Sequence, residues 1–250
     1  MKKTPYLILS LLLLISCVGE DLVNDYVDPD LRISNAILSI SEGFQYQFKA
    51  RFFDESGTKV ENPTLVWRVD PPSAASITQD GTIKAITAGQ ATVIVQTTGL
   101  QGNIIEARTT FTITAVANTE TTTTETSTMT TDTETSTMTG VLVAPQYFEG
   151  EIHSTSSYAL EGKFRYEHDG TRITLSLDSS YRASTSLPGL YIYLGNNPRT
   201  VNGAFEIGEV KVFSGAHQYV LPPSIELTDY KYIIYWCKPF SVPVGEGEIF

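Results

Sequence analysis

The sequence is poor in the two side chains that build most metal and disulfide sites. Its 250 residues include two cysteines and three histidines. A cysteine-rich zinc site and a dense disulfide framework both need more of these residues, so neither can be built. Common catalytic motifs are also missing, among them the Gly-x-Ser-x-Gly turn of hydrolases, the phosphate-binding P-loop, His-Glu-x-x-His and Cys-x-x-Cys. The sequence therefore offers no candidate catalytic residue.

Basic side chains are scarce as well. Lysine and arginine number 17 against 28 aspartates and glutamates, so the net charge is −11. A net-negative chain attracts a phosphate backbone only weakly, so we expect no nucleic-acid partner. Hydrophobic residues make up 41% of the chain and charged residues 18%, which is the composition of a folded protein rather than a disordered one. The length predicts one or two domains.

Long hydrophobic runs are limited to one stretch near the N-terminus, from Leu7 to Ile15. A transmembrane helix needs about 20 apolar residues, so this stretch is too short to span a bilayer. Lys2 and Lys3 precede it, and a basic start before a short apolar core is typical of a secretory signal peptide. We therefore predict a signal peptide over residues 1–16.

The four residues LISC, which end at Cys17, resemble the lipobox of bacterial lipoproteins. The resemblance implies that the signal is cut before Cys17 and that Cys17 carries a lipid anchor, so the membrane is a predicted partner. Two or more acyl chains anchor a protein stably. Glu20 and Asp21 resemble the acidic export signal of some surface lipoproteins, so we expect a cell-envelope location, in the outer membrane, on its periplasmic face or the cell surface. The alternative is an ordinary signal peptide with a coincidental cysteine.

Two segments of biased composition lie outside the predicted domains. Residues 17–29 are acidic and predict a tether after the lipid-bearing cysteine. Residues 119–139 contain 13 threonines and the repeat TETSTMT, at 124–130 and 133–139. This stretch has no apolar periodicity to bury, so it cannot offset the entropy of ordering it. We predict a flexible linker over 117–146, and a glycan carrier is consistent with its composition; a long threonine-rich strand is the alternative.

Residues 30–116 show the period-two pattern of half-buried strands. Phe44, Tyr46 and Phe48 alternate with polar residues. The dipeptide Asp80-Gly81 separates two short apolar segments, which is a strong hairpin signal because both turn positions tolerate positive φ. Short strands at this spacing predict a β-sandwich.

The pieces that carry a family resemblance in this module are Leu38-Ser39-Ile40 with Gly43, Leu65-Val66-Trp67, Ala75-Ser76-Ile77, Asp80–Ala85 and Ala88–Val93. Together they resemble the bacterial Ig-like domain of group 2. The resemblance implies a sandwich of about seven strands without a disulfide, which usually serves as a spacer or an adhesive unit. We expect Trp67 to pack between the sheets, although a ligand-stacking role is the alternative.

Residues 147–250 hold ten of the thirteen tyrosines, all three histidines and the second cysteine. Five apolar or alternating segments predict strands, and no segment predicts a helix. These segments are 172–177, 190–194, 207–213, 217–221 and 232–237. The fold class that we predict for the whole chain is therefore all-β, with two β-sandwich domains.

A second resemblance covers most of this module. It is carried by Pro188–Leu194, Ile207-Gly208, Gly215–Pro222, Tyr232–Cys237 and Phe240-Ser241-Val242. These residues resemble the DM13 domain, also called the electron-transfer DM13 domain. The resemblance implies a β-sandwich found in redox-type extracellular modules, and a cysteine that acts as a bare thiol or contacts a prosthetic group. That position is Cys237 here, which makes Cys237 the redox candidate.

Cys237 is the only thiol left if Cys17 is lipidated. Strand alternation places it on one face with Ile233 and Tyr235, while Trp236 faces the other way. A reactive thiol needs a lowered pKa and some exposure. Free cysteines are also among the most buried residues, so simple core packing is the alternative.

His217 precedes an aromatic strand and would neighbour Cys237 if the two strands paired. A Cys/His pair suits a transition metal or haem iron, although the residues alone define no metal site and no particular cofactor. The candidates for a ligand pocket are Tyr191, Tyr193, His217, Tyr219, Tyr235 and Trp236.

The leading hypothesis is a cell-envelope lipoprotein with an Ig-like spacer or adhesion module and a DM13-type binding module. Its partner would be a protein or a glycan, and Cys237 would give the second module a redox role. One rival hypothesis is an electron-transfer protein that binds haem or a metal through the DM13-type domain. Another is a carbohydrate-binding surface protein that uses exposed tyrosines.

Overall fold

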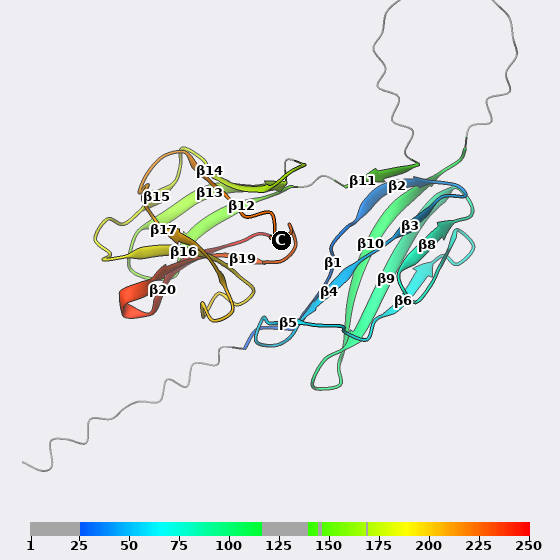
Figure 1. Cartoon of the computed structure of the whole chain (residues 1–250), viewed down its shortest axis with the longest axis horizontal. Helices are drawn as coiled ribbons and strands as arrows, with labels where there is room; N and C mark the ends of the chain where they lie inside the picture. The colour runs from blue at the N-terminus through cyan, green and yellow to red at the C-terminus, as the bar shows by residue number, and fades with distance from the viewer. Residues whose placement is uncertain (1–25, 117–139, 145–146, 169) are drawn as a thin grey trace, which may run out of the picture.

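The computed structural model describes residues 26–116, 140–144, 147–168 and 170–250. The predicted signal peptide, Cys17 and the threonine-rich repeats lie outside the described residues. Within the described ranges the chain is all-β, with one short 3₁₀ turn, η1 (Lys238–Phe240). Figure 1 shows two groups of strands, one from each half of the chain. Among the residues described, no helix has the length and apolar character needed to cross a membrane.

The first domain consists of three sheets around one core. Their orders are β11-β2-β10-β9-β6, β3-β8-β7 and β1-β4-β5. The strands are β1 (Asp30–Ile33), β2 (Ile37–Ser41), β3 (Gln45–Gln47), β4 (Ala50–Phe53), β5 (Lys59–Val60), β6 (Val66–Asp70), β7 (Ala75–Ile77), β8 (Thr82–Ala85), β9 (Gly89–Thr98), β10 (Ile104–Thr114) and β11 (Val141–Val143).

The alternation of the sequence accounts for the core of this domain. Ala91, Val93 and Val95 lie on one face of β9 and are buried, because successive residues of a strand point to opposite faces. Trp67 is buried in the same cluster, as the core-packing prediction required. The predicted hairpin also forms: β7 pairs with β8, and Gly81 adopts a φ of +83°. A Cβ there would lie 2.7 Å from a backbone carbonyl oxygen, so the turn requires glycine.

Residues 141–143, which fall within the predicted linker, form a strand of the first domain. β11 pairs antiparallel with β2 on one side, while β10 pairs parallel with β2 on the other. Thr114 at the end of β10 lies opposite Ser41, and Val141 at the start of β11 lies opposite Ile40. Thr114 and Val141 are therefore two strand spacings apart, about 10 Å. The direct connection between the domains is only residues 144–146.

The second domain is one strongly curved sheet of nine strands. Its order is β17-β16-β19-β20-β12-β13-β14-β18, and β15 pairs with β13. The strands are β12 (Tyr147–Ser154), β13 (Leu160–His168), β14 (Ile173–Leu177), β15 (Arg182–Ala183), β16 (Leu190–Gly195), β17 (Phe205–Glu209), β18 (His217–Val220), β19 (Tyr232–Cys237) and β20 (Val242–Glu248).

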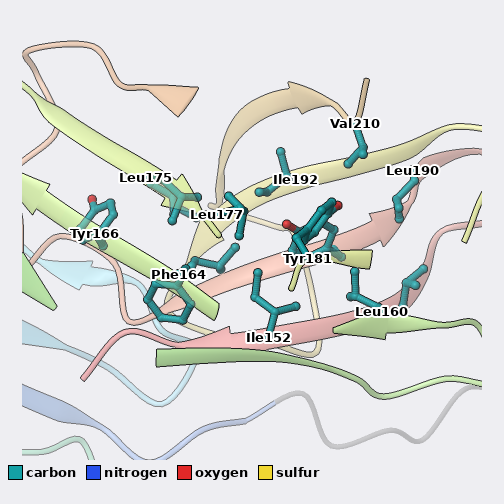
Figure 2. Packing of buried hydrophobic residues seen from close by; sticks show 14 of the residues in the cluster. Ile152, Leu160, Phe164, Tyr166, Leu175, Leu177, Tyr181, Leu190, Ile192 and Val210 are labelled. Atoms are coloured by element: carbon teal, nitrogen blue, oxygen red, sulfur yellow. The ribbon is translucent and has the colours of Figure 1, made fainter. Parts of the chain in front are cut away.

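The sheet curves so that its two halves face each other across a single core. Tyr166 and Leu175 come from β13 and β14, whereas Ile192 and Tyr235 come from β16 and β19, yet all four belong to one buried cluster. Figure 2 shows this packing from close by, with the aliphatic and aromatic side chains of facing strands in contact. The interior of the second domain is thus enclosed by its own sheet.

Arg32 on β1 joins the two domains. Its guanidinium donates one hydrogen bond to the backbone oxygen of Thr228 (3.0 Å) and one to Oδ1 of Asn196 (2.9 Å). The same group lies between the rings of Phe53, at 4.1 Å, and Phe250, at 4.8 Å. The Arg32 side chain is only 6% exposed, so the contact is a buried one.

Arg51 on β4 adds an ionic contact between the domains. It forms ion pairs with Glu226 and, at 2.9 Å, with Asp229. It also donates a hydrogen bond to the Thr228 hydroxyl at 3.3 Å. The two arginines of the first domain therefore bind the same loop of the second.

Candidate functional site

Strand β19 divides the predicted site residues between its two faces. Ile233, Tyr235 and Cys237 belong to the main core of the second domain. Trp236 belongs to a separate small cluster with Ile234. The faces are those that alternation predicts for this strand.

The inner face carries a group of four polar rings. Tyr181 and Tyr235 are both 0% exposed, and their ring centroids are 6.1 Å apart. The ring of His217 lies 4.7 Å from Tyr181 and 5.3 Å from Tyr219, both in edge-on geometry. We call Tyr181, His217, Tyr219 and Tyr235 the inner cluster. Figure 2 shows Tyr181 among the aliphatic side chains of the core.

Each member of the inner cluster reaches the interior for a local reason. Tyr235 is an inward residue of the central strand β19, and His217 and Tyr219 are the inward residues of the edge strand β18, whose other residues are exposed. Tyr181 lies just before β15, and its backbone accepts a hydrogen bond from the amide of Gly215 at 3.0 Å. The cluster therefore joins three parts of the domain that are distant in the sequence.

The polar atoms of the inner cluster have no hydrogen-bond partner among the residues that the structure describes. These atoms are the Oη atoms of Tyr181, Tyr219 and Tyr235 and Nε2 of His217. Burial raises the pKa of all three phenols, most strongly that of Tyr235. The phenols are therefore neutral hydroxyl groups at physiological pH.

The contact made by Nδ1 of His217 identifies the tautomer of its ring. Nδ1 lies 2.9 Å from the backbone oxygen of Gly215. A carbonyl oxygen only accepts hydrogen bonds, so we assign the proton of the neutral ring to Nδ1. Nε2 then presents a lone pair to the interior. The inner cluster thus holds one pure acceptor and three hydroxyls that both donate and accept.

Cys237 lies two residues from Tyr235 on the same face of β19. It is a free cysteine and is 0% exposed, and its register partners are Leu190 on β16 and Val242 on β20. Its strand does not pair with the strand of His217, because β18 pairs with β14 at the far end of the described sheet. The strand pairing that would make His217 a direct neighbour of Cys237 does not form.

The other three pocket candidates lie on the outer face. Tyr193 donates a hydrogen bond to Glu206 (2.9 Å), and Lys238 donates one to the same carboxylate (2.7 Å) while its ammonium lies 4.5 Å from the centroid of the Tyr191 ring. The hydrogen bond from Lys238 lowers the pKa of Glu206. Tyr193 is 5% exposed and Trp236 is 8% exposed, so neither ring presents a face to solvent.

The six pocket candidates therefore fall into two groups of three, on opposite faces of one sheet. Tyr181, which the sequence prediction missed, completes the inner group. It follows a polar stretch, Asp178-Ser179-Ser180, so no periodicity marks it as a core residue. The only signal was the general enrichment of tyrosine in this half of the chain.

The described residues do not form a metal site with three or more protein ligands. No group of three or more histidine, cysteine, aspartate or glutamate side chains in these ranges converges to hold an ion. Cys237 and His217 lie on strands that do not pair with each other, so they are not neighbours within the sheet.

A cavity of about 800 Å³ lies at the junction of the two domains. Its lining combines aromatic residues with charges of both signs, and it includes Tyr26, Asp30, Arg32, Glu55, Lys231 and Tyr232. None of the predicted site residues lines it.

The fold defines a two-domain, all-β protein with a group of buried polar rings inside its second domain. Comparison with protein families also divides the chain into two domains. Residues 29–103 match the bacterial Ig-like domain of group 2, and residues 148–249 match the domain described as electron transfer DM13. The chain contains a bacterial Ig-like domain of group 2 followed by a DM13 domain.

Comparisons with curated proteins and with solved structures do not identify a function. No curated protein matches the chain. One solved structure covers 89% of this chain and 90% of its own, at 14% sequence identity and a TM-score of 0.23. Its title describes the promiscuous specificity of carbohydrate-binding modules from the β-sandwich superfamily. A TM-score this low does not support a shared function.

Proposed function

We propose that this protein is a lipid-anchored cell-envelope protein whose DM13 domain is a redox-active binding module, with Cys237 as the redox group. The Ig-like domain holds that module in a fixed orientation. The match to the electron transfer DM13 domain supports this proposal, and the inner cluster, on the same face as Cys237, carries it in the structure. Cys237 is fully buried, so the proposed role requires local opening of the domain before an oxidant reaches the sulfur.

The membrane location is supported by the sequence around Cys17. We expect a radioactive fatty acid to label the protein in cells, and the label and the membrane association to be lost in Cys17→Ala. An unlabelled protein that fractionates with the soluble proteins would contradict the anchor, but it would leave the redox proposal standing.

The redox role is tested in the full chain with Cys17→Ser, in which Cys237 is the only thiol. The oxidant is hydrogen peroxide. The O–O bond breaks as an S–O bond forms, the sulfur loses two electrons, and one water leaves, so the thiol becomes a sulfenic acid. We expect the native protein to gain the mass of one oxygen, and the additional variant Cys237→Ala to gain none. A thiol that reacts only after denaturation would refute the redox role.

An absorption spectrum of the same purified protein tests the rival hypothesis. A haem or a metal–thiolate centre would absorb in the visible, and the band would disappear in Cys237→Ala. Such a band would replace the bare-thiol proposal with one in which a cofactor carries the electrons. A colourless protein with a reactive thiol is the result that we expect.

A further inference from the structure

We propose that the inner cluster is a binding site for a neutral, water-sized guest that both donates and accepts hydrogen bonds. The guest is held by Tyr181, His217, Tyr219 and Tyr235 inside the DM13 domain. This inference goes beyond the proposed function, because the site would exist whether or not Cys237 is reactive.

The argument begins with the four polar atoms that have no partner in the described parts of the chain. Nearly all buried polar groups of folded proteins are hydrogen-bonded, to protein or to an enclosed molecule. A buried hydroxyl or imidazole nitrogen without a partner loses its hydration and gains nothing in return. Tyr181 and Tyr235 are fully buried, and four such atoms in one place would cancel a sizeable share of a domain's stability.

Hydrogen bonds within the cluster cannot remove this deficit. The hydroxyls of Tyr181 and Tyr235 are close enough for a hydrogen bond between them to affect the pKa of each, but neither meets the distance and angle of a hydrogen bond with any described residue. Even a direct bond between them would leave His217 Nε2 and the Tyr219 hydroxyl unsatisfied. A guest in contact with all four groups satisfies them together.

The donors and acceptors define the guest. Nε2 of His217 carries a lone pair, so the guest must donate a hydrogen bond. The three phenols are neutral hydroxyls, so the guest must also accept, and no phenolate is present to neutralise a cation. An anion would face the lone pair of Nε2. The surrounding residues are apolar, which excludes a charged guest that lacks a counter-ion.

The spacing of the rings limits the size of the guest. Neighbouring ring centroids lie between 4.7 and 6.1 Å apart, so the rings pack against one another and no large molecule fits between them. Water meets all of these requirements, since it donates two hydrogen bonds and accepts two. Buried water typically makes about three hydrogen bonds to polar groups that are otherwise unsatisfied.

The test uses the sign of a stability change in the full chain. Tyr235→Phe removes one hydroxyl and leaves the ring in place. If a guest satisfies the hydroxyl, the substitution removes a formed hydrogen bond, and we expect the folding equilibrium constant to fall by about fivefold. If the hydroxyl is truly unsatisfied, the same substitution stabilises the protein. Tyr219→Phe should behave in the same way, and it removes a hydroxyl outside the Tyr181–Tyr235 pair.

Two matched variants on the outer face calibrate the measurement. Tyr193→Phe removes a hydrogen bond that the structure shows, to Glu206, so it gives the effect of one lost bond. Tyr191→Phe changes a half-buried ring outside the inner cluster and should have little effect. An increase in stability in Tyr219→Phe, or in both Tyr235→Phe and Tyr219→Phe, would overturn the proposal.

A second measurement identifies the guest. In the native protein we expect nuclear Overhauser effects from a long-lived water to the ring protons of His217 and Tyr181. Their absence, in a protein that gives resolved spectra for both rings, would overturn the assignment to water. A visible iron(III)–phenolate absorption band in the purified protein would also overturn it, because the guest would then be a charged metal ion.

Discussion

Removal of Arg32 should loosen the contact between the two domains, leaving the ion pairs of Arg51. Its guanidinium makes two hydrogen bonds to the second domain, to Thr228 and Asn196, and it is nearly fully buried between two aromatic rings. A hydrogen bond from a charged group contributes about 1.5–3 kcal/mol, so the two bonds contribute at least about 3 kcal/mol to the contact between the domains. A loss of about 3 kcal/mol lowers the docking equilibrium constant roughly 100-fold.

Small-angle X-ray scattering of Arg32→Ala measures this effect, and we expect a larger radius of gyration and a broader distribution of distances. Arg68→Ala is the matched control. Arg68 pairs with Glu106 at 2.9 Å within the first domain, so its loss should leave the scattering profile unchanged. An Arg32→Ala protein as compact as the wild type, with both domains folded, would refute the idea that this arginine holds the domains together.

Three further predictions concern the stability of the individual domains. Gly81→Ala should lower the stability of the Ig-like domain by at least about 1 kcal/mol, measured by thermal unfolding, because φ is +83° and the added methyl meets a backbone oxygen. Burial raises the pKa of Tyr181 and Tyr235. Above about pH 10 the unfolded chain releases these protons and the folded one keeps them, so stability should fall as the pH rises; a double phenylalanine variant should lose part of that slope in denaturant titrations. The pKa of Glu206 is lowered by Lys238, so its small contribution is present at neutral pH and should be lost on acidification; Glu206→Gln should show a weaker acid dependence.

The faces of the strands could be predicted from the sequence, because alternation is a local property. Tyr235 and Cys237 were expected on one side of their strand and Trp236 on the other, and the structure places them so. The same rule turns His217 and Tyr219 inward from an edge strand. Each of these conclusions needs only the residues next to it in the sequence.

The contacts between distant segments could not be predicted in this way. Tyr181 enters the core from a polar turn, where no period exists to mark it. Arg32 lies in a short alternating strand as an ordinary polar residue, and its partners are more than 160 residues further along the chain. The pairing of β11 with β2 depends on three residues that follow the threonine repeats. All three are contacts between segments far apart in the sequence, which local patterns of residues do not encode.

The position of β11 has a consequence for the evolution of the threonine repeats. The threonine repeats leave the Ig-like domain from β10 and return to it at β11, so they do not separate the two domains. A gene that gained or lost copies of the seven-residue unit would alter only the stretch between those two strands. The distance from the Ig-like domain to the DM13 domain would stay as residues 144–146 and the Arg32 contact set it. The number of repeats can therefore vary without altering the contact between the two domains.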